Sequence, residues 1–174
     1  MTNLVLRGVA ILAASVFLTG AAAAQQTTNR VAASTDWSVF VEESPKECWG
    51  VSQPKETVNT KDGKPVQVRR GDILLFVTFR PGKPGEVSFM GGYPFASGST
   101  VDLEVNNGAK FTLFTDGEGA WAGSPEEDAK IIAALKAGAD VTVGGHSGRG
   151  TYTKDKFSLM GFTAAMEEAA KRCK

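Results

Sequence analysis

His146 is the first candidate for a catalytic residue, because it is the only histidine in the sequence that could act as a general base. Ser147 follows it directly, so a serine hydrolase can be imagined. However, adjacent residues cannot easily form the hydrogen bond between a nucleophile and its base, and the sequence has no Gly-x-Ser-x-Gly elbow. We therefore interpret His146 as an ordinary loop residue.

Asp116 and Glu118 are a second candidate, since they flank Gly117 at the end of an expected strand. Paired carboxylates can hydrolyse glycosidic bonds, but this chemistry is defined by the distance between them, which a sequence does not give. Both are also ordinary turn residues. The sequence has no calcium-loop spacing, and a single histidine excludes most multi-histidine sites. We predict no metal and no cofactor.

The glycine-rich stretch 145–150 superficially resembles a phosphate-binding loop. It lacks the Lys-Ser/Thr ending of a Walker motif and has no preceding strand with a following helix. We interpret it as a mobile hairpin loop, in which Arg149 could meet an anionic ligand.

Tyr93 and Phe95 lie in a second expected loop, 91–95. An aromatic side chain in a loop is either tucked under the sheet or displayed to a partner, and aromatic residues are enriched at recognition surfaces. Tyr93, Phe95 and Arg149 are therefore our candidate partner-binding residues. The three tryptophans are expected in the core or at its rim: Trp37, Trp49 and Trp121.

Short β-like runs between turn residues must position these side chains. They recur from Thr35 onward at the spacing typical of a β-sandwich or β-barrel. The run 73–79 is apolar on both faces, which predicts a central strand covered on both sides. The Asp62-Gly63 turn predicts a hairpin whose second strand covers 66–69.

Two helices accompany the strands. The first is expected over about 124–137, because Ser124 suits the N-cap, Glu127 completes a capping box and Gly138 stops the helix. The second is expected over about 162–173. Its apolar positions lie on one helical face, and they are Phe162, Ala165, Met166, Ala169 and Cys173.

Residues 1–24 have the pattern of a cleavable signal peptide. Arg7 is their only charge, the apolar run 9–18 follows, and the small residues 21–24 form the cleavage site. An uncleaved anchor is the alternative, but the run is well short of the roughly 20 residues that span a bilayer. We predict a flexible segment over 25–34 and one domain over 35–174, with no transmembrane segment after cleavage.

Export changes the interpretation of Cys48 and Cys173, the only cysteines. In an oxidising compartment they allow one disulfide, and the helical spacing directs Cys173 towards the body of the domain. The alternative is a pair of free thiols, one of them catalytic. Because there is no Cys-x-x-Cys and the only histidine is remote in sequence, we predict the disulfide.

Three stretches and their order along the chain carry a family resemblance. They are the expected first strand around Trp37 followed by Cys48, the run Gly71–Val77, and the closing run Phe157–Ala165, which contains Ser-Leu-x-Gly-Phe-x-x-Ala. Together they resemble the invasion-associated locus B family of alphaproteobacterial exported proteins. The resemblance implies an immunoglobulin-like β-sandwich in the periplasm or envelope, and it brings no catalytic residues. This sequence departs from the family pattern in one respect: many relatives carry their cysteines closer together near the first strands, whereas here the second is Cys173.

The sequence therefore predicts a mainly β protein, an exported single-domain sandwich with two accessory helices, in the periplasm or cell envelope. We expect it to bind an envelope protein or a glycan and not to be an enzyme. The alternative is a periplasmic hydrolase that uses Asp116, Glu118 or His146. Because the 19 basic residues are matched by 19 acidic ones, a strongly basic nucleic-acid binder is excluded.

Overall fold

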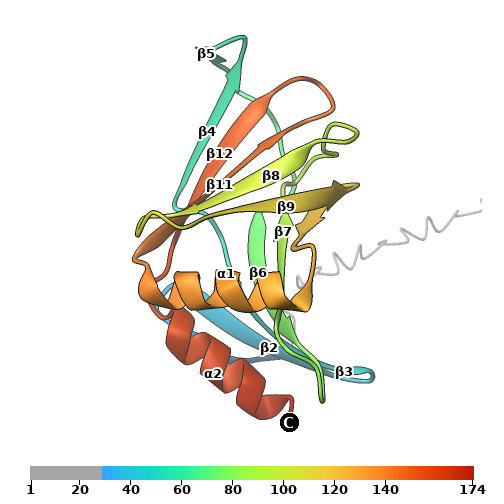
Figure 1. Cartoon of the computed structure of the whole chain (residues 1–174), viewed down its shortest axis with the longest axis vertical. Coiled ribbons are helices and arrows are strands. Elements are labelled where there is room, and N and C mark those ends of the chain that lie inside the picture. The colour runs from blue at the N-terminus through green and yellow to red at the C-terminus, as the bar shows by residue number, and fades with distance from the viewer. Residues whose placement is uncertain (1–28) are drawn as a thin grey trace, which may run out of the picture.

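The computed structural model describes residues 29–174, which form twelve strands and two helices (Figure 1). This confirms the predicted mainly β fold with two accessory helices. The elements are β1 (Arg30–Ser34), β2 (Trp37–Glu43), β3 (Lys46–Ser52), β4 (Glu56–Lys61), β5 (Lys64–Pro65), β6 (Leu74–Phe79), β7 (Glu86–Met90), β8 (Thr100–Val105), β9 (Lys110–Asp116), β10 (Gly119–Trp121), α1 (Pro125–Ala137), β11 (Asp140–His146), β12 (Tyr152–Ser158) and α2 (Phe162–Arg172).

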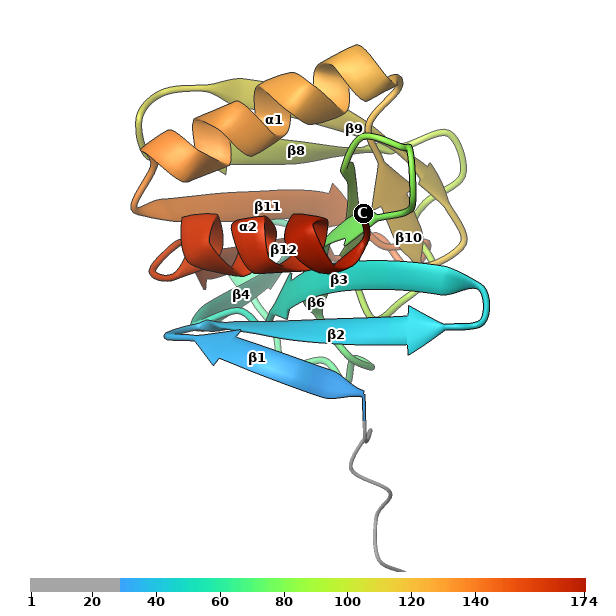
Figure 2. The ribbon, with the colours of Figure 1, turned by 90° about the horizontal axis from the view of Figure 1, so that it is seen from below.

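The strands form one antiparallel sheet in the order β1-β2-β3-β6-β7-β10-β9-β8-β11-β12-β4-β5. The sheet curls around its core, as Figures 1 and 2 show. Strands far apart in the sheet order therefore meet. Trp37 Nε1 in β2 donates a 2.9 Å hydrogen bond to the carbonyl of Ser158 in β12, and the rings of Phe89 and Phe157 contact edge to face with centroids 6.1 Å apart. The immunoglobulin-like sandwich stays a prediction.

Alternation along the strands decides which side chains enter the core. In β8 buried and exposed residues alternate without exception. In β6, Leu75 and Val77 are fully buried. Leu74 and Phe76 point to the other face of the sheet and are only partly buried. Strand β6 therefore lies inside the sheet, as predicted, but only one of its faces is fully covered, whereas the sequence predicts cover on both.

Helix α1 begins where the capping residues predict. The Ser124 hydroxyl accepts a hydrogen bond from the Glu127 amide at 3.3 Å, and the Glu127 carboxylate accepts one from the Gly123 amide at 3.0 Å. The Asp128 carboxylate accepts a hydrogen bond from the Val87 amide at 2.8 Å. This last contact fixes α1 to β7.

Helix α2 packs on β2 and β3, beside α1 (Figures 1 and 2). Its buried face is the predicted one and consists of Phe162, Ala165, Met166 and Ala169. Cys173 follows the helix and is bonded to Cys48 of β3, with the two Cα atoms 5.7 Å apart. The predicted disulfide is confirmed, and it attaches the C-terminal helix to the sheet.

The structure differs from the sequence analysis at two segments. Arg30–Ser34, expected within the flexible segment 25–34, forms the edge strand β1, because its backbone pairs with β2 and Ala32 packs against the core. The strand expected over 66–69 is absent, and the hairpin strand β5 ends at Pro65. After Pro65 the chain leaves the sheet, which allows Arg70 to reach the interior.

The signal peptide predicted over residues 1–24 lies outside the described residues. Neither α1 nor α2, the two helices in residues 29–174, has the length and apolar character needed to cross a membrane.

Candidate functional site

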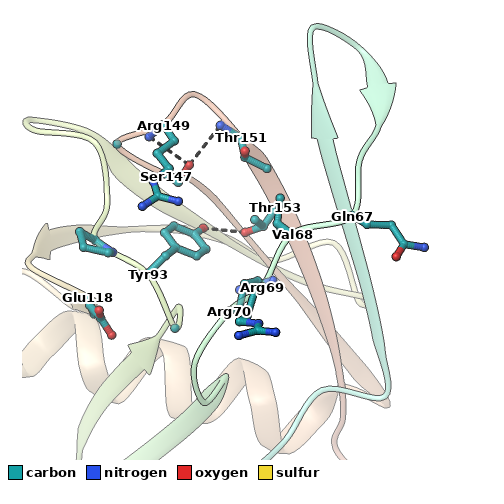
Figure 3. A pocket seen from close by; sticks show the side chains of 13 residues that line it. Gln67, Val68, Arg69, Arg70, Tyr93, Glu118, Ser147, Arg149, Thr151 and Thr153 are labelled. Carbon is teal, nitrogen blue, oxygen red and sulfur yellow. Dashed lines mark hydrogen bonds between the residues drawn. The ribbon is translucent and has the colours of Figure 1, made fainter.

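A cavity of about 630 Å³ opens where three segments meet: the stretch before β6, the loop after β7 and the loop from β11 to β12 (Figure 3). We call it the Tyr93 cavity. The lining side chains that define its chemistry are Arg69, Arg70, Tyr93, Glu118, Arg149 and Thr153. Two of the three predicted partner-binding residues, Tyr93 and Arg149, therefore lie at one site.

Tyr93 is half-buried and held on several sides. Its hydroxyl lies 2.6 Å from the Thr153 hydroxyl and donates to the Gly145 carbonyl at 3.3 Å. The guanidinium of Arg70 stacks against the ring, 4.9 Å from its centroid. A tyrosine hydroxyl is protonated at neutral pH, and burial raises the pKa of Tyr93 further above its ordinary value. The result is an oriented aromatic wall with a neutral polar end.

Arg70 is anchored beneath this wall by a buried ion pair with Asp155. Arg70 Nη1 lies 2.8 Å from Asp155 Oδ1, and Nη2 lies 2.6 Å from Oδ2. The guanidinium also donates to the Gly91 carbonyl, and Thr57 donates to the same carboxylate. The positive charge of Arg70 is therefore neutralised inside the protein, and its role at the cavity is to position Tyr93.

The loop that carries Arg149 is held by its own hydrogen bonds. The Ser147 hydroxyl accepts from the amides of Arg149 and Thr151 at 3.3 and 3.1 Å. Lys61 donates to the Arg149 carbonyl at 3.1 Å. Gly150 has a φ of +78°, a conformation that favours glycine. The loop interpreted from the sequence as mobile is therefore tied to itself and to β4.

The unpaired charge at the Tyr93 cavity is mainly positive. Arg69 and Arg149 are both exposed, and no ion pair seen in residues 29–174 involves either of them. Within the described part of the chain, Glu118 is the one carboxylate that lines the cavity. Figure 3 shows Tyr93 between the Arg149 loop and the segment that carries Arg69. Two free guanidinium groups beside an aromatic ring suit a carboxylate or phosphate group.

Phe95, the third predicted partner-binding residue, is not displayed at the surface. It is only 8% exposed and belongs to the core. Its ring contacts that of Tyr93 edge to face, with centroids 5.0 Å apart. Phe95 thus supports Tyr93 from behind and does not itself line the cavity.

The residues considered for catalysis are not brought together. His146 is exposed at the end of β11, and its ring lies beside that of Tyr152. Asp116 and Glu118 are exposed at the turn between β9 and β10, where Gly117 has a φ of +58°. The part of the chain covering residues 29–174 contains no group of three or more His, Cys, Asp or Glu side chains that could hold a metal ion.

Sequence reasoning missed Arg69, Arg70 and Asp155. One signal could have found Asp155: alternation in β12 places it on the same face as Thr153 and Phe157, which are buried. A carboxylate on a core face requires a partner. Nothing in the sequence identifies Arg70 as that partner, because it lies in a segment without regular structure.

Comparison with known protein families gives a match over most of the described residues. The family model described as "Invasion associated locus B (IalB) protein" matches residues 37–170. The match confirms the resemblance drawn from the sequence. No curated protein and no solved structure matches the chain.

Proposed function

The chain belongs to the invasion-associated locus B family, and on that premise we propose that it is an exported protein of the periplasm or cell envelope that binds a partner through the Tyr93 cavity. The group bound is a carboxylate or phosphate displayed by an envelope protein or glycan. The observation that carries this proposal is the pair of unneutralised guanidinium groups, Arg69 and Arg149, beside the oriented ring of Tyr93.

Three features support export. The sequence begins with the pattern of a cleavable signal peptide. The Cys48–Cys173 disulfide is typical of an oxidising compartment. The resemblance to exported proteins of the same family points in the same direction.

Binding is favoured over hydrolysis because of what the candidate catalytic groups contact. A general base needs a nucleophile or a substrate-facing position, whereas the ring of His146 lies beside Tyr152. We expect His146→Ala to leave binding unchanged. A hydrolytic activity that this variant abolishes in a folded protein would replace the binding proposal with the periplasmic hydrolase.

The proposal is tested by crosslinking capture from the native envelope. Arg149→Gln and Arg69→Gln should each reduce recovery of the partner, and high salt should do the same, since the attraction is electrostatic. Lys83→Gln is the matched control: it removes one positive charge from an exposed turn remote from the cavity. Equal recovery with all three variants would contradict the proposal.

A further inference from the structure

The outer face of the sheet carries a second hollowed surface, which adjoins the Tyr93 cavity at Glu118. The residues of β3, β6, β7 and β10 that alternate with the core positions line an open groove of about 580 Å³, in which apolar and aromatic side chains stand beside the polar Glu47, Thr78, Glu86 and Ser88. We call it the aromatic groove and define it by Trp49, Leu74, Phe76, Met90 and Trp121. An adjoining hollow of about 680 Å³ shares Trp49, Leu74 and Phe76, so the two form one elongated surface.

Two flat indole rings are held in place on this surface. Trp49 stacks on Phe40 with the ring planes 8° apart and the centroids 5.7 Å apart. Trp121 lies across Gly119, where a Cβ atom would come within 2.2 Å of the indole. Trp121 also contacts Phe114, with centroids 5.9 Å apart. Both rings are therefore fixed before any ligand arrives.

The charges of the groove disfavour an anion. Among residues 29–174, Arg80 is the only cation that lines the groove, and it is paired with Glu47 at 2.6 Å and with Glu86 at 3.2 Å. Asp72 and Glu118 add two more carboxylates to the lining. The aromatic groove is thus acidic where the Tyr93 cavity is basic, and Glu118 lines both.

The backbone of this face offers no hydrogen bonds to a partner. Strands β3, β6, β7 and β10 are each paired on both sides within the sheet. A peptide strand therefore cannot be added here, since strand addition needs a free edge. What remains is recognition by side chains alone, through ring faces and carboxylate oxygens.

We propose that the aromatic groove binds a neutral, hydroxyl-rich glycan chain. The face of an aromatic ring is electronegative and attracts the partly positive C–H groups of a sugar ring. Carboxylates accept hydrogen bonds from sugar hydroxyls. The elongated surface, with an indole at Trp49 and another at Trp121, fits a chain of several sugars. This site shares Glu118 with the Tyr93 cavity but differs from it in its aromatic side chains and in its charge.

The experiment is calorimetric titration of the full mature protein with chitotetraose, cellotetraose and maltotetraose, with tetragalacturonate as the anionic comparison. At least one neutral probe should bind, and its affinity should change little with salt. Trp49→Ala and Trp121→Ala should each weaken it at least about 10-fold, as expected when a central aromatic anchor is truncated. Val58→Ala, on the outer edge of the sheet at β4, is the control.

Circular dichroism shows whether each variant is folded. If a tryptophan variant fails to fold, saturation-transfer NMR on the wild-type protein takes the place of that variant. Saturation should then pass from the aromatic protons of the protein to the protons of the sugar. Failure of all neutral probes to bind at millimolar concentration overturns the proposal, as does binding that both tryptophan variants retain. A wild-type dimer that Trp121→Ala converts to monomer would assign the face to a second copy. Arg149→Gln should leave the affinity for the neutral probe unchanged, because Arg149 lines the Tyr93 cavity and not the aromatic groove. Failure of the glycan proposal can therefore be distinguished from failure of the proposed function.

Discussion

Arg70 and Asp155 form a two-point ion pair that the rest of the protein seals from water. Arg70 Nη2 lies 2.6 Å from Asp155 Oδ2, and the side chains are 5% and 0% exposed. The arginine comes from a segment without regular structure and the aspartate from β12, 85 residues away in sequence. The pair thus joins the segment bearing Arg69 to the strand behind Tyr93.

The first prediction is that Asp155→Asn destabilises the protein by about 3–5 kcal/mol, because it leaves the guanidinium of Arg70 buried without a counter-charge. The free energy of unfolding from urea titration measures this. Asp140→Asn is the matched control. Asp140 lies 3.7 Å from Lys156 in a half-exposed pair, and such pairs contribute only about 0–1 kcal/mol. Similar losses for both variants would show that the buried pair is not a major constraint.

The second prediction concerns the Cys48–Cys173 disulfide, which spans 125 residues. Replacing Cys173 with serine should lower the free energy of unfolding by about 5 kcal/mol, the chain-entropy value for a loop of this length. Hydrogen exchange should rise most in α2, because the bond attaches the end of that helix to β3. Thiol labelling of denatured, unreduced wild-type protein from an oxidising compartment should find no free cysteine. Two labelled thiols would contradict the assignment.

The sequence predicted elements wherever the signal was local. Ser124 and Glu127 placed the start of α1, and the spacing of Phe162 to Ala169 placed α2 with its buried face. Arg30–Ser34 was assigned wrongly because its strand depends on pairing with β2, which a polar, small sequence does not reveal. The single curled sheet likewise depends on pairings between distant strands.

The site was predicted only in part, for the same reason. Tyr93 and Arg149 are recognisable as loop residues of useful chemistry, but their meeting depends on three segments that the fold brings together. Phe95 has the same sequence context as Tyr93, and only the direction of its side chain decides that it is buried. The sequence predicts a strand over 66–69, which would include Arg69 and end just before Arg70, whereas both residues lie in a segment without regular structure.

The third prediction is a pH dependence at Asp128. Burial raises its pKa above the ordinary value, although the hydrogen bond from the Val87 amide opposes the shift. The pKa of Asp128 is therefore higher in the folded protein than in the unfolded protein. At pH values between these two pKa values, the folded state binds more protons than the unfolded state. The contribution of Asp128 to the free energy of unfolding therefore falls as pH rises through this range. Asp128→Asn keeps an acceptor for Val87 and should remove this contribution to the slope of unfolding free energy against pH.

Asp128→Ala serves as the comparison, because it leaves the Val87 amide without its partner. It should cost about 1–3 kcal/mol at neutral pH, whereas Asp128→Asn should not. Urea titrations of the wild-type protein and both variants between acidic and neutral pH would measure the two effects. An unchanged slope in Asp128→Asn would assign the pH dependence to another group.

The last prediction separates fold from recognition at the two loop aromatics. Phe95→Ala should destabilise the protein by about 3–5 kcal/mol, because it empties a site in the core beside Phe89 and Tyr93. Tyr93→Phe keeps the ring and removes only the hydroxyl bonded to Thr153 and Gly145, so its cost should be about 1 kcal/mol. Replacing Tyr93 with serine should therefore weaken partner capture more than Tyr93→Phe does, since it removes the ring that lines the cavity. Thermal unfolding and envelope capture, measured on the same preparations, give the two readouts. A Phe95→Ala protein with wild-type stability would mean that Phe95 is displayed after all, and its burial behind Tyr93 would then be wrong.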